Sequence, residues 1–223
     1  MLDTVERTET AGGESLPAVS RSKLKGIAVC GSNPHTKGLA PFNDPGWLVY
    51  ACSPDNTPAG MGPGKGALPR VDQFFEVHQP VFDKTRPYPY LEWISAQPFK
   101  LWMRDRLAMN LGTGHGRLLF PNAVPYPEKE LKARFGPFTF TSSIAFILAK
   151  AIVDIEAMVA EGRMGGDGAP PELGLWGILQ SSKPEYEKQR QGTQNLIWAA
   201  TQSGIKVRVA PESRLFEPPP EDF

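Results

Sequence analysis

The stretch FTFTSSIAFILAKAIV, residues 138–153, carries the pattern from which the fold is inferred. It predicts a strand-like entry at 138–140, a cluster of hydroxyl groups at Thr141, Ser142 and Ser143, and then a helix that is apolar on nearly all sides. Thr141 or Ser142 can cap that helix by accepting from backbone N–H groups. A helix without a polar face packs inside a layered core, and its N-terminus attracts anions. The stretch is therefore either an ordinary capped core helix or one that faces a ligand.

Length and composition predict one folded domain without a strong overall charge. The chain has 223 residues, of which 40% are hydrophobic, and Lys plus Arg equal Asp plus Glu at 24 each. That length and apolar content suffice for a single core, and a neutral chain has no global field that recruits nucleic acid or membrane. We expect a flexible tail at 1–23, a domain at 24–215 and a disordered tail at 216–223.

The cysteines and the absence of long apolar runs predict a cytoplasmic protein. Cys30 and Cys52 each lie in an apolar run typical of a buried strand, where a free cysteine behaves as a small hydrophobe. No apolar run approaches the roughly 20 residues that span a bilayer. The polar segment 1–22 also lacks the apolar centre of a signal peptide, so we expect no membrane association.

Six short apolar runs separated by helical or irregular segments predict the fold class. Expected helices cover 88–94, 126–131 and 185–203 in addition to the apolar helix, whereas 107–124 is expected to be irregular. Strands alternating with helices indicate a mostly parallel sheet covered on both faces. The expected fold is α/β, a single Rossmann-like domain with a six-stranded sheet. Its expected strands cover residues 25–30, 47–53, 71–78, 99–104, 172–178 and 204–210.

The loops that follow these strands form the predicted ligand site. In a parallel sheet the carboxyl ends of the strands meet at one edge, and ligands bind there. Gly31 allows a phosphate to approach the backbone, and Ser32 and Asn33 offer hydrogen-bond donors, although a plain strand-to-helix turn gives the same pattern. The same edge is expected to hold Ser53, Thr141, Ser142, Ser143 and Gly177.

His78 and Glu76 are the candidate catalytic residues. His78 ends the third expected strand, where its imidazole could act as a general acid or base, and Glu76 is the alternative base. Asp72, Glu76 and His78 share one face of that strand, but simple strand alternation produces the same spacing. A structural histidine is the competing interpretation. No metal-ligand cluster is visible in the sequence.

Taken together, several segments resemble a known Rossmann-like family. These are Gly31-Ser32-Asn33-Pro34, Ala51-Cys52-Ser53, Phe140–Ala145, Leu175–Ile178 and Glu185-Tyr186. The family includes CMP-sialic-acid-dependent bacterial sialyltransferases, the related domain of motility accessory factors, archaeal hydroxymethylpterin diphosphokinase-like proteins and small phage proteins. The length is most similar to that of the phage members. The resemblance implies a nucleotide or nucleotide-sugar ligand, used as a donor, with the first glycine loop and the Thr-Ser helix start holding phosphates and sugar.

The sequence departs from the sialyltransferase pattern at several points. Gly31-Ser32-Asn33-Pro34 has one glycine fewer than their glycine-asparagine-glycine-proline turn, and Ser53 replaces an asparagine. Gly177-Ile178-Leu179 lacks their aspartate, and no histidine follows it as a base. His78 would have to supply that base from another strand.

Two functions follow from these observations. The first is a glycosyltransferase-like, nucleotide-dependent transferase, acting on a glycan or on a modified nucleobase if the protein is phage-encoded. The second is a non-catalytic protein that binds or sequesters a nucleotide. DNA is a weaker candidate partner because gripping a duplex needs a basic face, which would have to come from residues near the C-terminus: Lys188, Arg190, Lys206, Arg208 and Arg214.

Overall fold

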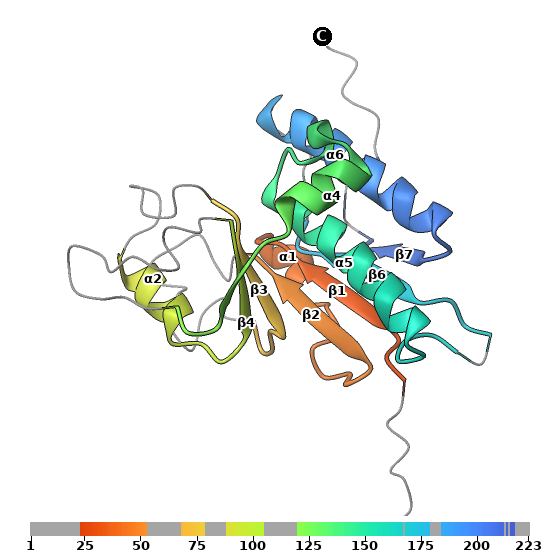
Figure 1. Cartoon of the computed structure of the whole chain (residues 1–223), viewed down its shortest axis with the longest axis horizontal. Helices are drawn as coiled ribbons and strands as arrows, with labels where there is room; N and C mark the ends of the chain where they lie inside the picture. Colours follow the sequence, from red (N-terminus) through yellow and green to blue (C-terminus); the bar gives the residue numbers. More distant parts are fainter. Residues whose placement is uncertain are drawn as a thin grey trace, which may run out of the picture.

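The computed structural model describes residues 23–52, 68–78, 88–104, 120–166, 168–178, 184–211, 213 and 215–216. Its centre is a parallel sheet in the order β5-β4-β3-β2-β1-β6-β7 (Figure 1). The predicted α/β class and parallel sheet are confirmed. The strands are β1 (Gly26–Cys30), β2 (Trp47–Ala51), β3 (Gln73–Glu76), β4 (Lys100–Met103), β5 (Ala123–Pro125), β6 (Glu172–Trp176) and β7 (Lys206–Val209).

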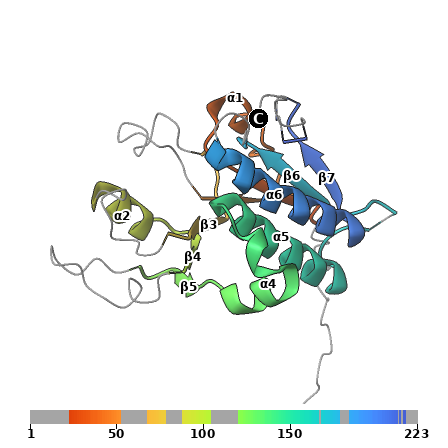
Figure 2. The ribbon, with the colours of Figure 1, turned by 90° about the horizontal axis from the view of Figure 1, so that it is seen from above.

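The helices follow the strands on both faces of the sheet. They are α1 (Pro34–Lys37), α2 (Tyr88–Ser95), α4 (Glu128–Phe135), α5 (Ser143–Ala160) and α6 (Pro184–Gln202), with a short 3-10 helix η2 (Pro137–Thr139) before α5. Figures 1 and 2 show α4, α5 and α6 grouped together and α2 well apart from them.

Strand direction and chain handedness explain this grouping. From β1 to β5 the chain adds strands on one side, and after β5 it returns to add β6 and β7 on the other side of β1. Because crossovers between parallel strands are right-handed, the reversal moves the connecting helices to the opposite face. Tyr90, Leu91 and Ile94 of α2 therefore pack in one core cluster, whereas the buried residues of α5 and α6 pack in the other.

β1 lies in the interior of the sheet and is fully buried, pairing in parallel with β2 and β6. Its side chains alternate between the two cores, with Ile27 and Val29 on the α5 face and Ala28 and Cys30 on the α2 face. A continuous apolar run is what burial on both faces requires. The chain reverses between β1 and β6, so the topological switch point lies at their carboxyl ends.

Two local expectations were wrong. The sheet has a seventh strand, β5, in the segment expected to be irregular, and residues 137–139 form η2 instead of a strand-like entry. Pro137 and the positive φ of 82° at Gly136 bend the chain there, which an extended strand does not allow. α4 also extends to Phe135, beyond the helix expected at 126–131.

Candidate functional site

The described site candidates lie at the carboxyl edge of the sheet, which we define as the ends of β1, β3, β4 and β6 with the start of α5. Gly31, Ser32 and Asn33 follow β1, Gly177 follows β6, and Glu76 ends β3 with His78 two residues later. Ser53 lies outside the described residues. The ends of β1, β3 and β6, which are far apart in the sequence, thus lie on one edge of the sheet.

Glu76 and His78 form a hydrogen-bonded pair at the end of β3. Glu76 is 1% exposed. Its Oε1 atom accepts from the backbone N–H of His78 at 3.0 Å and lies 2.6 Å from the Nδ1 atom of the His78 ring. Its Oε2 atom accepts from the Tyr90 hydroxyl at 2.7 Å. The carboxylate is therefore held from two sides, by its own strand end and by α2.

This geometry orients the His78 ring. With Nδ1 protonated and donating to Glu76, the neutral ring carries its lone pair on Nε2. The His78 side chain is 39% exposed, while the carboxylate beneath it is buried. A histidine oriented by a buried carboxylate is the arrangement that general bases use. The two residues predicted as alternative bases thus form one unit, in which His78 is the outer member.

Arg104 follows β4 next to this pair, but on the α5 face of the sheet. Its Nη1 atom donates to the carbonyl of Val77 at 3.0 Å, and its Nε and Nη2 atoms donate to Glu128 of α4 at 2.8 and 2.7 Å. Hydrogen bonding from Arg104 and then from Lys132 lowers the pKa of Glu128 to about 2 against the cost of burial. The Arg104 guanidinium also lies 4.4 Å from the centroid of the Phe146 ring in the first turn of α5.

The start of α5 is capped and packed against α6. Ser142 is the N-cap, and its hydroxyl accepts from the backbone N–H of Ala145 at 3.2 Å, as predicted for a capping hydroxyl. Thr141 donates its hydroxyl to the carbonyl of Gln189 at 3.3 Å. A Cβ atom on Gly192 of α6 would strike the backbone carbonyl oxygen of Thr139 in η2 and would lie 2.5 Å from the Thr141 hydroxyl oxygen, so a glycine is needed there. Ser143 is the first residue of the helix.

The loops after β1 and β6 are joined to each other. The backbone N–H of Asn33 donates to the carbonyl of Gly177 at 2.8 Å, and the N–H of Gly177 donates to the buried hydroxyl of Thr36 at 2.9 Å. The Asn33 side chain caps α1 by accepting from the N–H of His35 at 2.9 Å. A Cβ atom on Gly177, whose φ is +68°, would lie 2.7 Å from the carbonyl oxygen of Gly31. Packing alone therefore requires glycine at this position, and ligand contact by these residues stays a prediction.

Two buried polar groups were not singled out from the sequence. The first is the Tyr90 hydroxyl. The second is a network on the α5 face, where Asp154 accepts from the Tyr50 hydroxyl at 2.7 Å and pairs with Lys150, which is 8% exposed. Burial raises the pKa of Tyr50 well above its usual range. The spacing of Lys150 and Asp154, four residues apart in an apolar helix, is a signal that could have revealed this pair.

Other candidate chemistry is weakened by the environment of the residues. Burial raises the pKa of the Cys30 thiol to about 12, so this thiol is protonated and a poor nucleophile at neutral pH. Lys206 and Arg208 both pair with Glu172, at 3.0 and 3.2 Å, and Arg190 is buried at 7% exposure. Arg190 is therefore withdrawn from the surface, whereas the side chains of Lys206 and Arg208 are 58% and 54% exposed, and DNA binding through them stays a prediction.

The described residues show neither a metal-binding group nor a membrane-spanning helix, and the chain has no match among known proteins. Within the described ranges, no group of three or more His, Cys, Asp or Glu side chains is arranged to hold a metal ion. None of the helices in the part of the chain that the structure describes is long and apolar enough to cross a bilayer. No protein-family model, curated protein or solved structure matches this chain.

Proposed function

We propose that this protein is a nucleotide- or nucleotide-sugar-dependent transferase, glycosyltransferase-like, in which His78 acts as the general base. The observation that carries the proposal is the 2.6 Å contact between His78 Nδ1 and the buried Glu76 carboxylate at the carboxyl edge of a parallel sheet. A transferase must remove a proton from an acceptor hydroxyl as it attacks the donor. Nε2 of His78 is the atom assigned to that step.

The proposed donor is a nucleotide or nucleotide sugar, which needs a place for its phosphates. The strand order, with a topological switch point between β1 and β6, supports binding at this edge. The N-terminus of α5 supplies backbone N–H groups and the positive end of a helix dipole. In the proposed reaction it stabilises the charge that develops on the leaving phosphate.

A non-catalytic nucleotide-binding protein is the second candidate. It is favoured by the sequence Gly177-Ile178-Leu179, which lacks an acidic residue after β6. The joined loops after β1 and β6 also use the N–H groups of Asn33, His35 and Gly177 within the protein.

A two-stage experiment tests both functions. In the first stage, thermal unfolding is measured with CMP, UDP, GDP, their sugars, ATP and cyclic dinucleotides, since a ligand that binds only the folded state raises Tm. If none of them raises Tm, both proposals fail. In the second stage, donor hydrolysis or transfer is measured for any ligand that binds.

The second stage separates catalysis from binding. His78→Ala is expected to reduce turnover by about 100-fold or more while the ligand still raises Tm. Glu76→Gln should reduce turnover too, because it removes the charge that stabilises the protonated ring. Lys25→Ala, at the opposite edge of the sheet, is the control and should retain turnover. Ligand binding without turnover in the unmodified protein would leave the second candidate, and turnover unaffected by His78→Ala would remove the role given to His78.

A further inference from the structure

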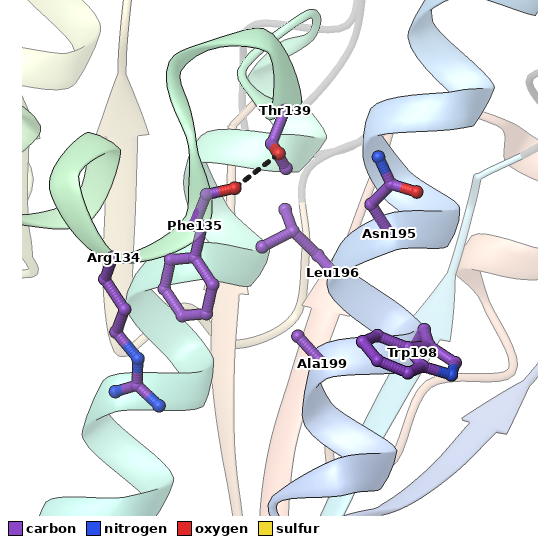
Figure 3. A pocket seen from close by; sticks show the side chains of 7 residues that line it. All are labelled: Arg134, Phe135, Thr139, Asn195, Leu196, Trp198 and Ala199. Carbon is purple, nitrogen blue, oxygen red and sulfur yellow. Dashed lines mark hydrogen bonds between the residues drawn. The ribbon is translucent and has the colours of Figure 1, made fainter.

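The outer surface of α6 and η2 presents large aromatic side chains to solvent. Phe138 of η2 is 92% exposed and Trp198 of α6 is 67% exposed. Next to Trp198, and lined also by Thr139, which follows Phe138 in the chain, lies a groove of about 380 Å³, which Figure 3 shows bounded by the Phe135 ring on one side and Trp198 on the other. The residues that line it are Arg134, Phe135, Thr139, Asn195, Leu196, Trp198 and Ala199.

This surface lacks charge to an unusual degree. From Gln191 to Ile205 the chain contains no charged residue, although charged residues make up 22% of the whole sequence. The exposed stripe of α6, which includes Gln191, Asn195, Trp198, Thr201 and Gln202, is therefore uncharged. Arg134, at the edge of the groove, is already paired with Glu156 at 2.5 and 2.6 Å. Depletion of charge around exposed aromatic residues distinguishes the core of a protein interface from ordinary surface.

We propose that this face, defined by η2, the groove and the exposed stripe of α6, forms a two-fold dimer with a second copy of the chain. A two-fold interface pairs a patch with itself, so the patch must carry both a projection and a recess. This face has both, because Trp198 is 67% exposed at the rim of the groove and Phe138, 92% exposed, directly precedes the lining residue Thr139. In the dimer, the aromatic side chains of each copy enter the groove of the other. A neutral face also brings no like charges together when it meets its own copy.

The dimensions of the face set the expected affinity. The stripe from Gln191 to Gln202 is about 18 Å long at 1.5 Å per residue, and the adjoining groove adds about one helix diameter of width. Such a footprint is at the low end of specific interfaces, for which micromolar dissociation constants are typical. The dimer is therefore expected to form at tens of micromolar protein and to dissociate on dilution.

Sedimentation equilibrium over a protein concentration series tests the proposal. The full chain is expected to shift from monomer to dimer, and Trp198→Glu and Phe138→Glu should each weaken the dimer by at least tenfold. Leu39→Glu is the matched control, since Leu39 is 61% exposed but precedes Ala40 and Phe42, which pack in the core cluster on the α2 face of the sheet. Circular dichroism confirms that each variant is folded.

A cross-linking experiment tests whether the two copies meet through the same face. In a Cys52→Ser background, Asn195→Cys should be joined between copies by a short bis-maleimide, and this product should disappear when Trp198→Glu is added. A chain that is monomeric at about 100 μM, well above the expected micromolar Kd, overturns the proposal. So does a dimer that Trp198→Glu and Phe138→Glu leave intact, or one that Leu39→Glu breaks instead.

Discussion

The Nδ1 atom of His78 lies 2.6 Å from the Oε1 atom of Glu76, and the Tyr90 hydroxyl donates to the other oxygen of the same carboxylate. One buried carboxylate thus joins the end of β3 to α2. The orientation of the histidine therefore depends on a helix that is separate from its own strand.

Replacing Tyr90 with Phe tests this dependence. The variant removes a hydrogen bond to a buried charged group, and we expect the free energy of unfolding to fall by about 1.5–3 kcal/mol. Urea denaturation measures the change. Tyr126→Phe is the matched control, because the Tyr126 hydroxyl donates to the uncharged carbonyl of Phe146 at 2.6 Å. Its expected loss is about 1 kcal/mol, and a loss equal to that of Tyr90→Phe would contradict the charged character of the Glu76 contact.

The pairing of Lys150 with Asp154 on the α5 face predicts that the stability cost of removing one partner depends on whether the other is still present. Asp154→Ala leaves a Lys150 ammonium that is 8% exposed without its carboxylate, and should cost about 3–5 kcal/mol. Replacing the whole network, with Tyr50→Phe, Lys150→Met and Asp154→Leu together, should recover most of that loss. Thermal and urea unfolding of the two variants provide the comparison, and equal stability of both would refute the coupling.

The contact between α6 and the start of α5 predicts an unusual response to Gly192→Ala. Alanine normally stabilises a helix interior by about 1 kcal/mol relative to glycine. Here the new Cβ atom would strike the backbone carbonyl of Thr139 as well as the Thr141 hydroxyl, so we expect destabilisation by about 1–3 kcal/mol. Gly38→Ala is the control, because a Cβ atom there meets nothing within 4 Å and its φ of −65° suits alanine. A more stable Gly192→Ala protein would show that α5 and α6 do not pack as described.

The ion pair of Glu128 with Arg104 predicts a pH dependence of stability. The pKa of Glu128 is lowered from its ordinary value of 4.5 to about 2 by hydrogen bonding, chiefly to Arg104. The unfolded chain therefore binds more protons in this range, and the stabilisation is complete above pH 4.5 and lost as the pH falls toward about 2. Glu128→Gln should flatten the curve of unfolding free energy against pH in this window. Glu130→Gln, at an exposed position of the same helix, should leave the curve unchanged.

The sequence predicted the main features of the fold because its strands and α5 are strongly patterned. β1 is a continuous apolar run, β6 is apolar after Glu172, and Ser142 stands directly before the apolar helix. β5 was missed because it has only three residues and contains Pro125, which is tolerated at the edge of a sheet. The order of the strands could not be predicted, since pairing depends on contacts between distant segments.

The candidate site was only partly predictable for the same reason. Alternation along β3 placed Glu76 and His78 on one side of the strand, but it could not show that the Glu76 carboxylate bends toward the His78 ring. Tyr90 comes from α2, so its contact with Glu76 appears only in three dimensions. The groove beside Trp198 likewise needs α4, η2 and α6 together.

The contact between Gly31 and Gly177 also limits how this sequence can evolve. A side chain at either position would strike the backbone of the other, so a mutation at one site is not rescued by any side-chain change at its partner. Folding therefore requires glycine at both positions, with or without a bound ligand. Conservation of these two glycines among homologues would therefore reflect a requirement of folding. Conservation that reflects activity is expected instead at Glu76, His78 and Tyr90.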